Sequence, residues 1–164
     1  MKKFLFSLLA PAVVLLSFTS MPDRVSFSGD WKLNEGKSEL GEFGGRFAAR
    51  AIKVDQKQDA ITIARTTPAF NGGDPVTTTL VLTYDGKETE STGFNNSKRK
   101  TTAKWSDDRQ TLTVITRTAI ERDGQTSEFK TTETWTLTKE GSLSVVSVSS
   151  SPRGDNTVKA MYDK

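Results

Sequence analysis

The chain has 164 residues, a formal net charge of +3 and 34% hydrophobic residues, and it contains neither cysteine nor histidine. This length suits one domain with a core of ordinary size. The missing residue types exclude disulfides, zinc sites of the usual nitrogen and sulfur kind, thiol nucleophiles and every catalytic triad with an imidazole base. We therefore expect no metal site and no cofactor.

The N-terminus has the order of charged and then apolar residues that is typical of a secretory signal. Lys2 and Lys3 precede an apolar run over residues 4–18, which is short for a membrane-spanning helix. We expect a signal peptide over residues 1–20, cleaved between residues 19 and 24, and a mature domain over residues 25–164. The mature protein would have no stable transmembrane segment and would be exported to the periplasm or the extracellular space.

The balance of charge gives little sign of a nucleic-acid partner. Processing would remove two lysines and leave 21 basic and 20 acidic residues, a net charge of +1. The one dense basic run is Lys98, Arg99 and Lys100, which we interpret as a solvated strand face. We expect the protein to bind no nucleic acid.

Most of the chain alternates apolar and polar residues with a period of two, the pattern of half-buried strands. About ten strands are predicted on this basis, starting with residues 27–33. Further alternating segments lie at residues 50–54, 61–65, 78–84, 103–105, 112–114, 129–137, 143–145 and 158–162.

The connections between these segments alternate in length. Short turns fall at residues 55–59, 85–86, 106–108 and 140–141, and longer stretches fall at residues 34–49, 68–75, 93–97 and 151–156, with a short connection at 123–124 as the exception. Successive connections of a meander lie at opposite ends of the sheet, so the short turns would gather at one end and the long loops at the other. The sequence predicts an all-β fold, a single antiparallel up-and-down β-barrel of about eight to ten strands with a loop-lined mouth.

Two of the connecting regions carry more specific expectations. Residues 34–49 contain four glycines, which favours a loop with at most one turn of helix at residues 47–49. Residues 87–91 are polar on both faces, which predicts a weak strand and a gap in the barrel wall that would serve as a side entrance.

The first predicted strand resembles that of a known group of barrels. Phe27, Gly29, Trp31 and the following Lys-Leu pair resemble the opening strand of fatty-acid-binding proteins, a branch of the calycins, which also include lipocalins and avidins. The C-terminal residues 162–164 resemble the end of that branch, and residues 25–164 resemble secreted bacterial lipocalin-like proteins.

The resemblance implies a calycin-like barrel, with structural roles for four residues: Gly29, Trp31, Tyr162 and Lys164. In lipocalins a basic residue from the end of the barrel packs over the first-strand tryptophan, and Lys164 is placed to do so for Trp31. Two features depart from the fatty-acid-binding branch. A glycine-rich stretch replaces the two-helix lid, and Ala160 stands where that branch has a carboxylate-binding arginine.

Strand parity predicts that Arg50, Arg65 and Arg99 point inward near the mouth. Cations at the entrance of an apolar pocket suit an anionic, fatty-acid-like amphiphile. In the alternative, each arginine lies beyond the core and reaches solvent over a filled barrel. The other candidate ligand-binding residues are Glu133, Tyr84, Trp105, Phe70 and Phe94.

Glu133 shares a strand face with Trp135, where an unpaired carboxylate would be unfavourable. We expect it to meet an inward arginine or a hydroxyl, and a catalytic acid with a raised pKa is the alternative. The serine-rich residues 144–151 are interpreted as a polar strand face, and Tyr84 and Tyr162 as interior hydrogen-bonding residues.

Three function classes remain. The leading one is a secreted or periplasmic binding protein, expected to be a monomer, that holds a small hydrophobic or amphipathic ligand inside the barrel. The second is a solid-cored envelope protein that binds a macromolecular partner through its mouth loops, with contacts at Phe43, Phe70, Phe94 and residues 152–155. An enzyme comes third, because no catalytic residue can be named. The four loop phenylalanines, which include Phe47, would serve either as a ligand rim or as anchors of their loops.

Overall fold

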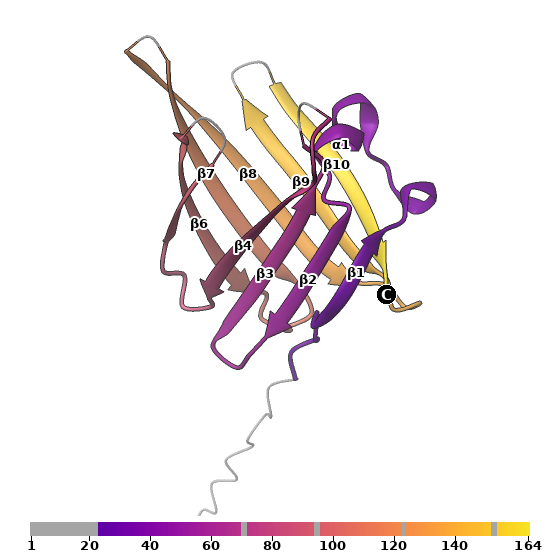
Figure 1. Ribbon diagram of the computed structural model, residues 1–164. Coiled ribbons are helices and arrows are strands. Elements are labelled where there is room, and N and C mark those ends of the chain that lie inside the picture. The colour runs from indigo at the N-terminus through magenta and orange to yellow at the C-terminus, as the bar shows by residue number, and fades with distance from the viewer. Residues whose placement is uncertain (1–22, 70–71, 94–95, 123, 152–153) are drawn as a thin grey trace, which may run out of the picture.

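The computed structural model describes residues 23–69, 72–93, 96–122, 124–151 and 154–164. Over these residues the chain forms ten strands, one 3₁₀ helix and one short α-helix (Figure 1). In chain order they are β1 (Gly29–Leu33), η1 (Glu35–Lys37), α1 (Gly41–Phe47), β2 (Ala51–Gln56), β3 (Ala60–Thr67), β4 (Val76–Thr83), β5 (Thr89–Thr92), β6 (Lys98–Trp105), β7 (Leu112–Arg122), β8 (Gln125–Leu137), β9 (Leu143–Ser151) and β10 (Gly154–Asp163).

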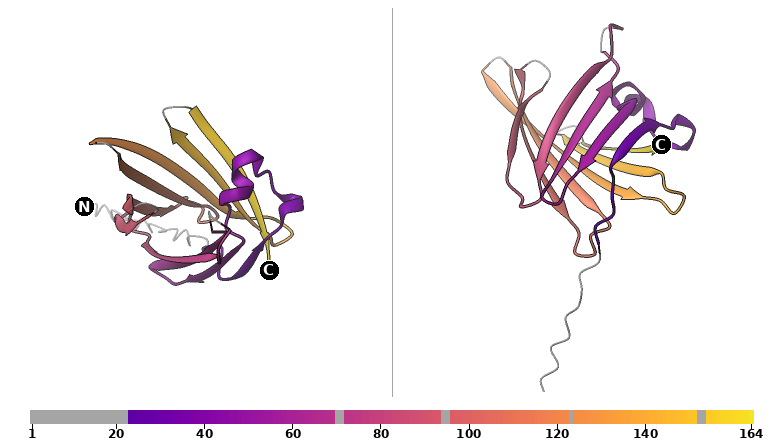
Figure 2. Two further views of the ribbon diagram at one scale, coloured as in Figure 1. Left: turned by 45° about the horizontal axis from the view of Figure 1, so that its top comes forward. Right: turned by 60° about the horizontal axis from the view of Figure 1, so that its bottom comes forward.

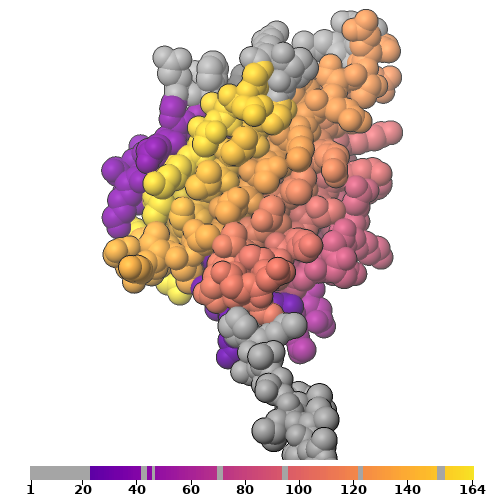
Figure 3. Space-filling model, turned by 180° about the vertical axis from the view of Figure 1, so that it is seen from behind, coloured from indigo at the N-terminus to yellow at the C-terminus, as the bar shows by residue number. Residues whose placement is uncertain are grey.

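The strands form one antiparallel sheet in the order β4-β3-β2-β1-β10-β9-β8-β7-β6-β5. Neighbours in the sheet are neighbours in the chain, except that β1 pairs with β10, where Lys32 lies opposite Asp163. This arrangement confirms the predicted up-and-down β-barrel. In the view from behind, the C-terminal strands, coloured orange to yellow, form one continuous outer surface (Figure 3).

The barrel is not fully closed, because β4 and β5 are the two free ends of the sheet. The Thr89 hydroxyl donates a hydrogen bond to the carbonyl of Val81 across this gap, at 3.2 Å. Because residues 87–91 are polar on both faces, a weak strand was predicted there, and the structure has the short strand β5 at the end of the sheet. The expected gap in the barrel wall is therefore confirmed at this position.

The two ends of the barrel differ in how they are covered. The short turns after β2, β4, β6 and β8 lie at one end, which we call the closed end, and α1 lies at the other, which we call the mouth (Figure 1). Figure 2 shows α1 beside β10 at the rim of the mouth. The alternation of connection lengths in the sequence predicted these two ends.

The connection between β1 and β2 was predicted to be a loop, and this prediction was wrong. It contains η1 and the seven-residue α1, which ends where the single helical turn was expected to begin. The glycines had favoured a loop, but one of them, Gly44, is needed for close packing of the helix against the barrel. A Cβ at Gly44 would lie 2.9 Å from Val158 Cγ2, so glycine lets the helix approach the barrel closely.

The connection between β9 and β10 was also wrongly predicted, as a long loop over residues 151–156. The two strands pair as far as Ser151 and Gly154, so only two residues connect them. Polar residues such as Asp155 and Asn156 are typical of loops, but here they continue the ladder opposite Ser150 and Ser149. The pairing of β9 with β10 therefore continues to this edge of the mouth.

Aromatic side chains pack the closed end. Phe27, Trp31 and Trp135 are almost completely buried, and Phe27 stacks on Trp105 with ring centroids 5.4 Å apart. Trp31 Nε1 donates a hydrogen bond to the Phe27 carbonyl at 2.8 Å, so the indole is satisfied although it is buried.

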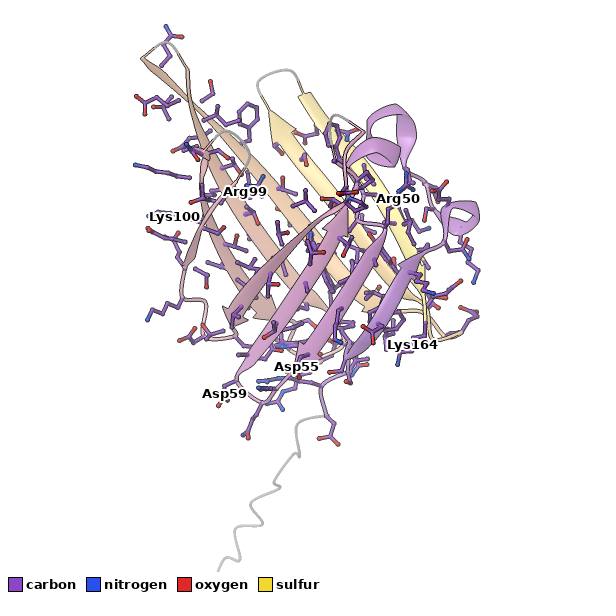
Figure 4. The ribbon with its side chains drawn as sticks, viewed as in Figure 1. Arg50, Asp55, Asp59, Arg99, Lys100 and Lys164 are labelled. Carbon is purple, nitrogen blue, oxygen red and sulfur yellow. The ribbon has the colours of Figure 1, made fainter. Side chains whose placement is uncertain are left out.

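The C-terminal Lys164 covers this plug. Its Nζ lies 5.0 Å from the centre of the Trp31 ring, as the resemblance predicted, and its chain would be 3.1 Å from a Cβ at Gly29 (Figure 4). The backbone at Gly29 has φ +142°, which disfavours any other residue. Gly29, Trp31 and Lys164 thus lie together at the closed end, and their structural roles stay a prediction.

Candidate functional site

The mouth half of the barrel is hollow. A cavity of about 310 Å³, which we call the mouth cavity, lies between α1 and strands β2, β3, β8, β9 and β10. Its apolar lining residues are Phe47, Ala48, Ala49, Ile52, Val145, Val158 and Ala160. Its polar lining residues are Arg65, Thr131, Glu133, Ser147, Ser149, Asn156 and Tyr162.

Strand register arranges this lining in rows from the closed end to the mouth. Leu143 of β9 lies opposite Tyr162 of β10, and the next inward row joins Val145 and Ala160. The row above it joins Glu133, Ser147 and Val158 across β8, β9 and β10. Apart from Tyr162, the floor of the cavity is thus apolar.

The last row before the rim is polar. It joins Thr131, Ser149 and Asn156, and the Thr131 and Ser149 hydroxyls are hydrogen-bonded at 3.2 Å. Along the wall made by β8, β9 and β10, polarity therefore increases towards the mouth, whereas Phe47 and Ala48 add apolar groups from the α1 side. A molecule with an apolar part and a polar part matches this gradient, because each part meets an environment of its own kind.

An ion pair crosses the interior at the level of Glu133. Arg65 Nη1 and Nη2 donate to Glu133 Oε1 and Oε2 at 2.7 and 2.5 Å, and Trp135 Nε1 donates to Oε2 at 3.0 Å. Arg65 belongs to β3 and Glu133 to β8, which are far apart in the sheet order. The pair therefore spans the barrel, and it confirms the expectation that Glu133 meets an inward arginine.

Both partners of this pair are charged. Burial raises the pKa of the Glu133 carboxyl, but the charge and hydrogen bonds of Arg65 outweigh burial and hold that pKa below its usual value. Burial likewise lowers the pKa of Arg65, and the Glu133 carboxylate more than compensates. The alternative of a catalytic acid with a raised pKa is therefore wrong for Glu133.

Tyr162 brings a neutral hydroxyl to the floor of the cavity. Its side chain is 3% exposed, and burial is the main reason why its pKa is raised to about 12. Within the described part of the chain, its hydroxyl makes no hydrogen bond. It is therefore available as a donor or an acceptor to a molecule in the cavity.

The sequence pointed to these polar residues only in part. Tyr162 shares inward parity with Ala160, which supported an interior role, but its part in the lining was not predicted. The serine-rich residues 144–151 were predicted to form one polar strand face, and this prediction was wrong, because strand alternation divides them: Ser147 and Ser149 line the cavity, whereas Ser144 and Ser150 lie on the other face of β9.

The three predicted arginines do not converge. Arg65 alone lines the cavity, whereas Arg50 is exposed, pairs with Glu35 and donates to the Gly45 carbonyl at 3.1 Å. Arg50 precedes β2, so strand alternation does not govern its direction. The prediction that all three point inward was wrong for Arg50.

Arg99 lies on the β6 side of the mouth, on the side of the barrel away from Arg50 (Figure 4). It is exposed and packs so closely on Gly93 that a Cβ there would be 2.3 Å from Arg99 Nε. It follows strand parity, but it is not part of the mouth cavity.

The predicted aromatic ligand residues lie elsewhere. Tyr84 and Trp105 belong to the aromatic plug of the closed end, with ring centroids 5.7 Å apart. Phe70 and Phe94 lie outside the described residues, as does the side chain of Phe43. Phe47 lines the cavity from α1 and is 59% exposed.

Other kinds of site were searched for over the same described residues. No group of three or more acidic side chains is placed to hold a metal ion. No helix there is both long enough and apolar enough to cross a membrane.

Comparison with known proteins supports the fold. No protein-family model matches the chain, and no curated protein matches it. Among solved structures, the zebrafish ileal bile acid-binding protein complexed with cholic acid matches with a TM-score of 0.53 and 17% sequence identity, covering 84% of this chain and 98% of the other. This chain is a calycin-like barrel. At this identity the likeness shows the fold alone.

The calycin-like fold changes the view of one sequence feature. The glycine-rich stretch after the first strand was predicted to be a loop in place of the two-helix lid of the fatty-acid-binding branch, but it contains η1 and α1. Ala160 remains a departure, because it puts a methyl group in the cavity lining where that branch has an arginine.

We predict that Glu133→Gln lowers the free energy of unfolding by about 3 kcal/mol, because it leaves the charge of Arg65 unpaired in the barrel interior. The matched variant Glu35→Gln breaks the exposed pair with Arg50 and should lower it by less than about 1 kcal/mol. Urea denaturation followed by tryptophan fluorescence measures both. Equal losses in the two variants would contradict the burial of the Arg65–Glu133 pair.

The loss of stability caused by Glu133→Gln should depend on pH. The pKa of Glu133 is lower in the folded chain, so the stabilisation by the pair is present above the unfolded pKa of about 4.3 and is lost as the pH falls through the folded value. The stability difference between wild type and Glu133→Gln should be full at neutral pH and shrink below about pH 4. A difference that is unchanged down to about pH 3 would contradict an ionised Glu133.

Proposed function

We propose that this protein binds a small hydrophobic or amphipathic molecule in the mouth cavity. The observation that carries the proposal is a cavity of about 310 Å³ above a tightly packed closed end, with a wall of β8, β9 and β10 that changes from apolar to polar towards the mouth. Its volume lies at the small end of the range of about 300–1,000 Å³ that is usual for ligand pockets.

Two further observations support a binding role. The solved structure with the same fold is a bile acid-binding protein that holds the amphipathic cholic acid. In this chain, burial of an apolar ligand part against Val145, Val158 and Ala160 would supply the free energy of binding. The polar row at the rim would keep hydrogen bonds to the other end of the ligand.

The cavity also bears on the two alternative functions, an envelope interaction protein and an enzyme. A solid-cored envelope protein would need the mouth half to be filled, and the hollow above Glu133 argues against it. Glu133, the acid considered for catalysis, is held ionised by Arg65. A binding protein that carries out no reaction therefore fits the described residues best.

We also propose that the protein is exported and that its leader is removed before Arg24. The residues just after the expected cleavage region are built into the closed end. The Arg24 guanidinium lies 4.8 Å from the centre of the Tyr84 ring, and the Val25 carbonyl accepts a hydrogen bond from Gln56 Nε2 at 2.9 Å. Cleavage beyond Val25 would remove these contacts from the fold.

Ser147→Phe should weaken binding of a neutral fluorescent hydrophobe such as Nile red by at least about tenfold, because the ring would fill the cavity beside Val158. Ser150→Phe is the matched control, since it changes the same residue type on the outward face of the same strand. Fluorescence titration of the two variants and wild type measures the effect. Equal binding by both variants would contradict binding in the mouth cavity.

N-terminal sequencing of the protein recovered from a secreting host tests the processing proposal. The expected result is one chain that begins between residues 20 and 24, with Arg24 retained. An uncleaved chain, or one that begins at Val25 or later, would contradict it.

A further inference from the structure

The charge inside the mouth cavity is balanced. Arg65 and Glu133 are the two charged side chains among its described lining residues, and they neutralise each other through two hydrogen bonds. Arg50 at the rim is also paired, through one contact with Glu35, and it donates a hydrogen bond to the Gly45 carbonyl. The cavity therefore offers a ligand no uncompensated positive charge from these residues.

This balance disfavours an anionic head group. A carboxylate next to Arg65 would also lie next to the Glu133 carboxylate, so attraction and repulsion would largely cancel. The anion would still lose its hydration on entering the barrel, and that loss would not be compensated.

Displacement of Glu133 would not remove this obstacle. Three donors hold its carboxylate, two from Arg65 and one from Trp135 Nε1, and its side chain is only 13% exposed. A ligand carboxylate that took Arg65 would leave Glu133 as an unpaired charge in the interior.

The polar groups that remain for a ligand are neutral. They are the Tyr162 hydroxyl on the floor, Ser147 beside Glu133, and the Thr131, Ser149 and Asn156 row at the rim. Each can donate or accept a hydrogen bond, so alcohol, amide and ester groups can all be satisfied by them.

We infer that the mouth cavity selects an uncharged amphiphile, a molecule with an apolar body and an alcohol, amide or ester head group, over a carboxylate of the same shape. This inference rests on the proposed binding function. It departs from the anionic, fatty-acid-like ligand that the arginines suggested in the sequence.

The test compares three ligands that differ only in the head group: dodecanol, dodecanamide and dodecanoate. Each is titrated near neutral pH, below its critical micelle concentration or solubility limit, against wild-type protein loaded with Nile red. We expect dodecanol and dodecanamide to displace the dye at concentrations at least about tenfold lower than dodecanoate.

Two variants separate charge balance from shape. Glu133→Gln leaves Arg65 uncompensated and should strengthen dodecanoate binding by at least about tenfold, with little effect on dodecanamide. The double variant Arg65→Gln with Glu133→Gln restores neutrality and should keep the preference for the uncharged ligands. It also serves if the single variant fails to fold.

The outcomes separate failure of the inference about selectivity from failure of the proposed binding function. Tighter binding of dodecanoate than of dodecanamide by wild type, abolished by Ser147→Phe, would overturn the inference and leave the proposed function standing. Failure of all three ligands to displace Nile red, or displacement that Ser147→Phe does not alter, would overturn both.

Discussion

The ion pair between Arg65 and Glu133 joins opposite walls of this barrel within the mouth cavity, one row above Val145 and Ala160 of its floor. Towards the closed end, aromatic and aliphatic side chains fill the interior around Trp135. Towards the mouth, the interior opens into a cavity of about 310 Å³. The pair joins β3 to β8 across the interior, so it fixes the position of two opposite walls of the cavity.

A buried ion pair of this kind contributes little net stability, because the attraction between the charges is offset by their loss of hydration. Apolar residues of similar volume would hold the walls together as well. What the pair changes is the electrostatic character of the cavity, since it places charge beside the ligand space without giving that space a net charge. The proposed selection of an uncharged ligand would account for charged groups at this place.

Period-two alternation was sufficient to predict the strands, the barrel and the closed end, because a half-buried strand leaves a direct mark on the sequence. It also placed Arg65 and Glu133 on inward faces. It failed for Arg50, which lies before its strand and turns outward to Glu35. It also failed for α1, because Gly44 signalled a loop although its role is close packing against Val158.

The partner of Glu133 was beyond what the sequence could specify. Arg65 is 68 residues away in the chain, and the pairing depends on how the sheet curves to face itself. The cavity was unpredictable for a related reason. Whether inward side chains fill a barrel depends on their joint packing, and residues such as Ala160 and Ser147 are compatible with either result.

Solution NMR of isotope-labelled protein titrated with dodecanamide would test the central claim most directly. The account predicts that resonances of Ser147, Ala160 and Tyr162 shift together, while Trp31 at the closed end is unaffected and the Arg65 Nε–H signal shows that its pair with Glu133 is kept. Shifts confined to the outer faces of the strands, or loss of the Arg65–Glu133 pair when the ligand binds, would contradict a neutral ligand site in the mouth of the barrel.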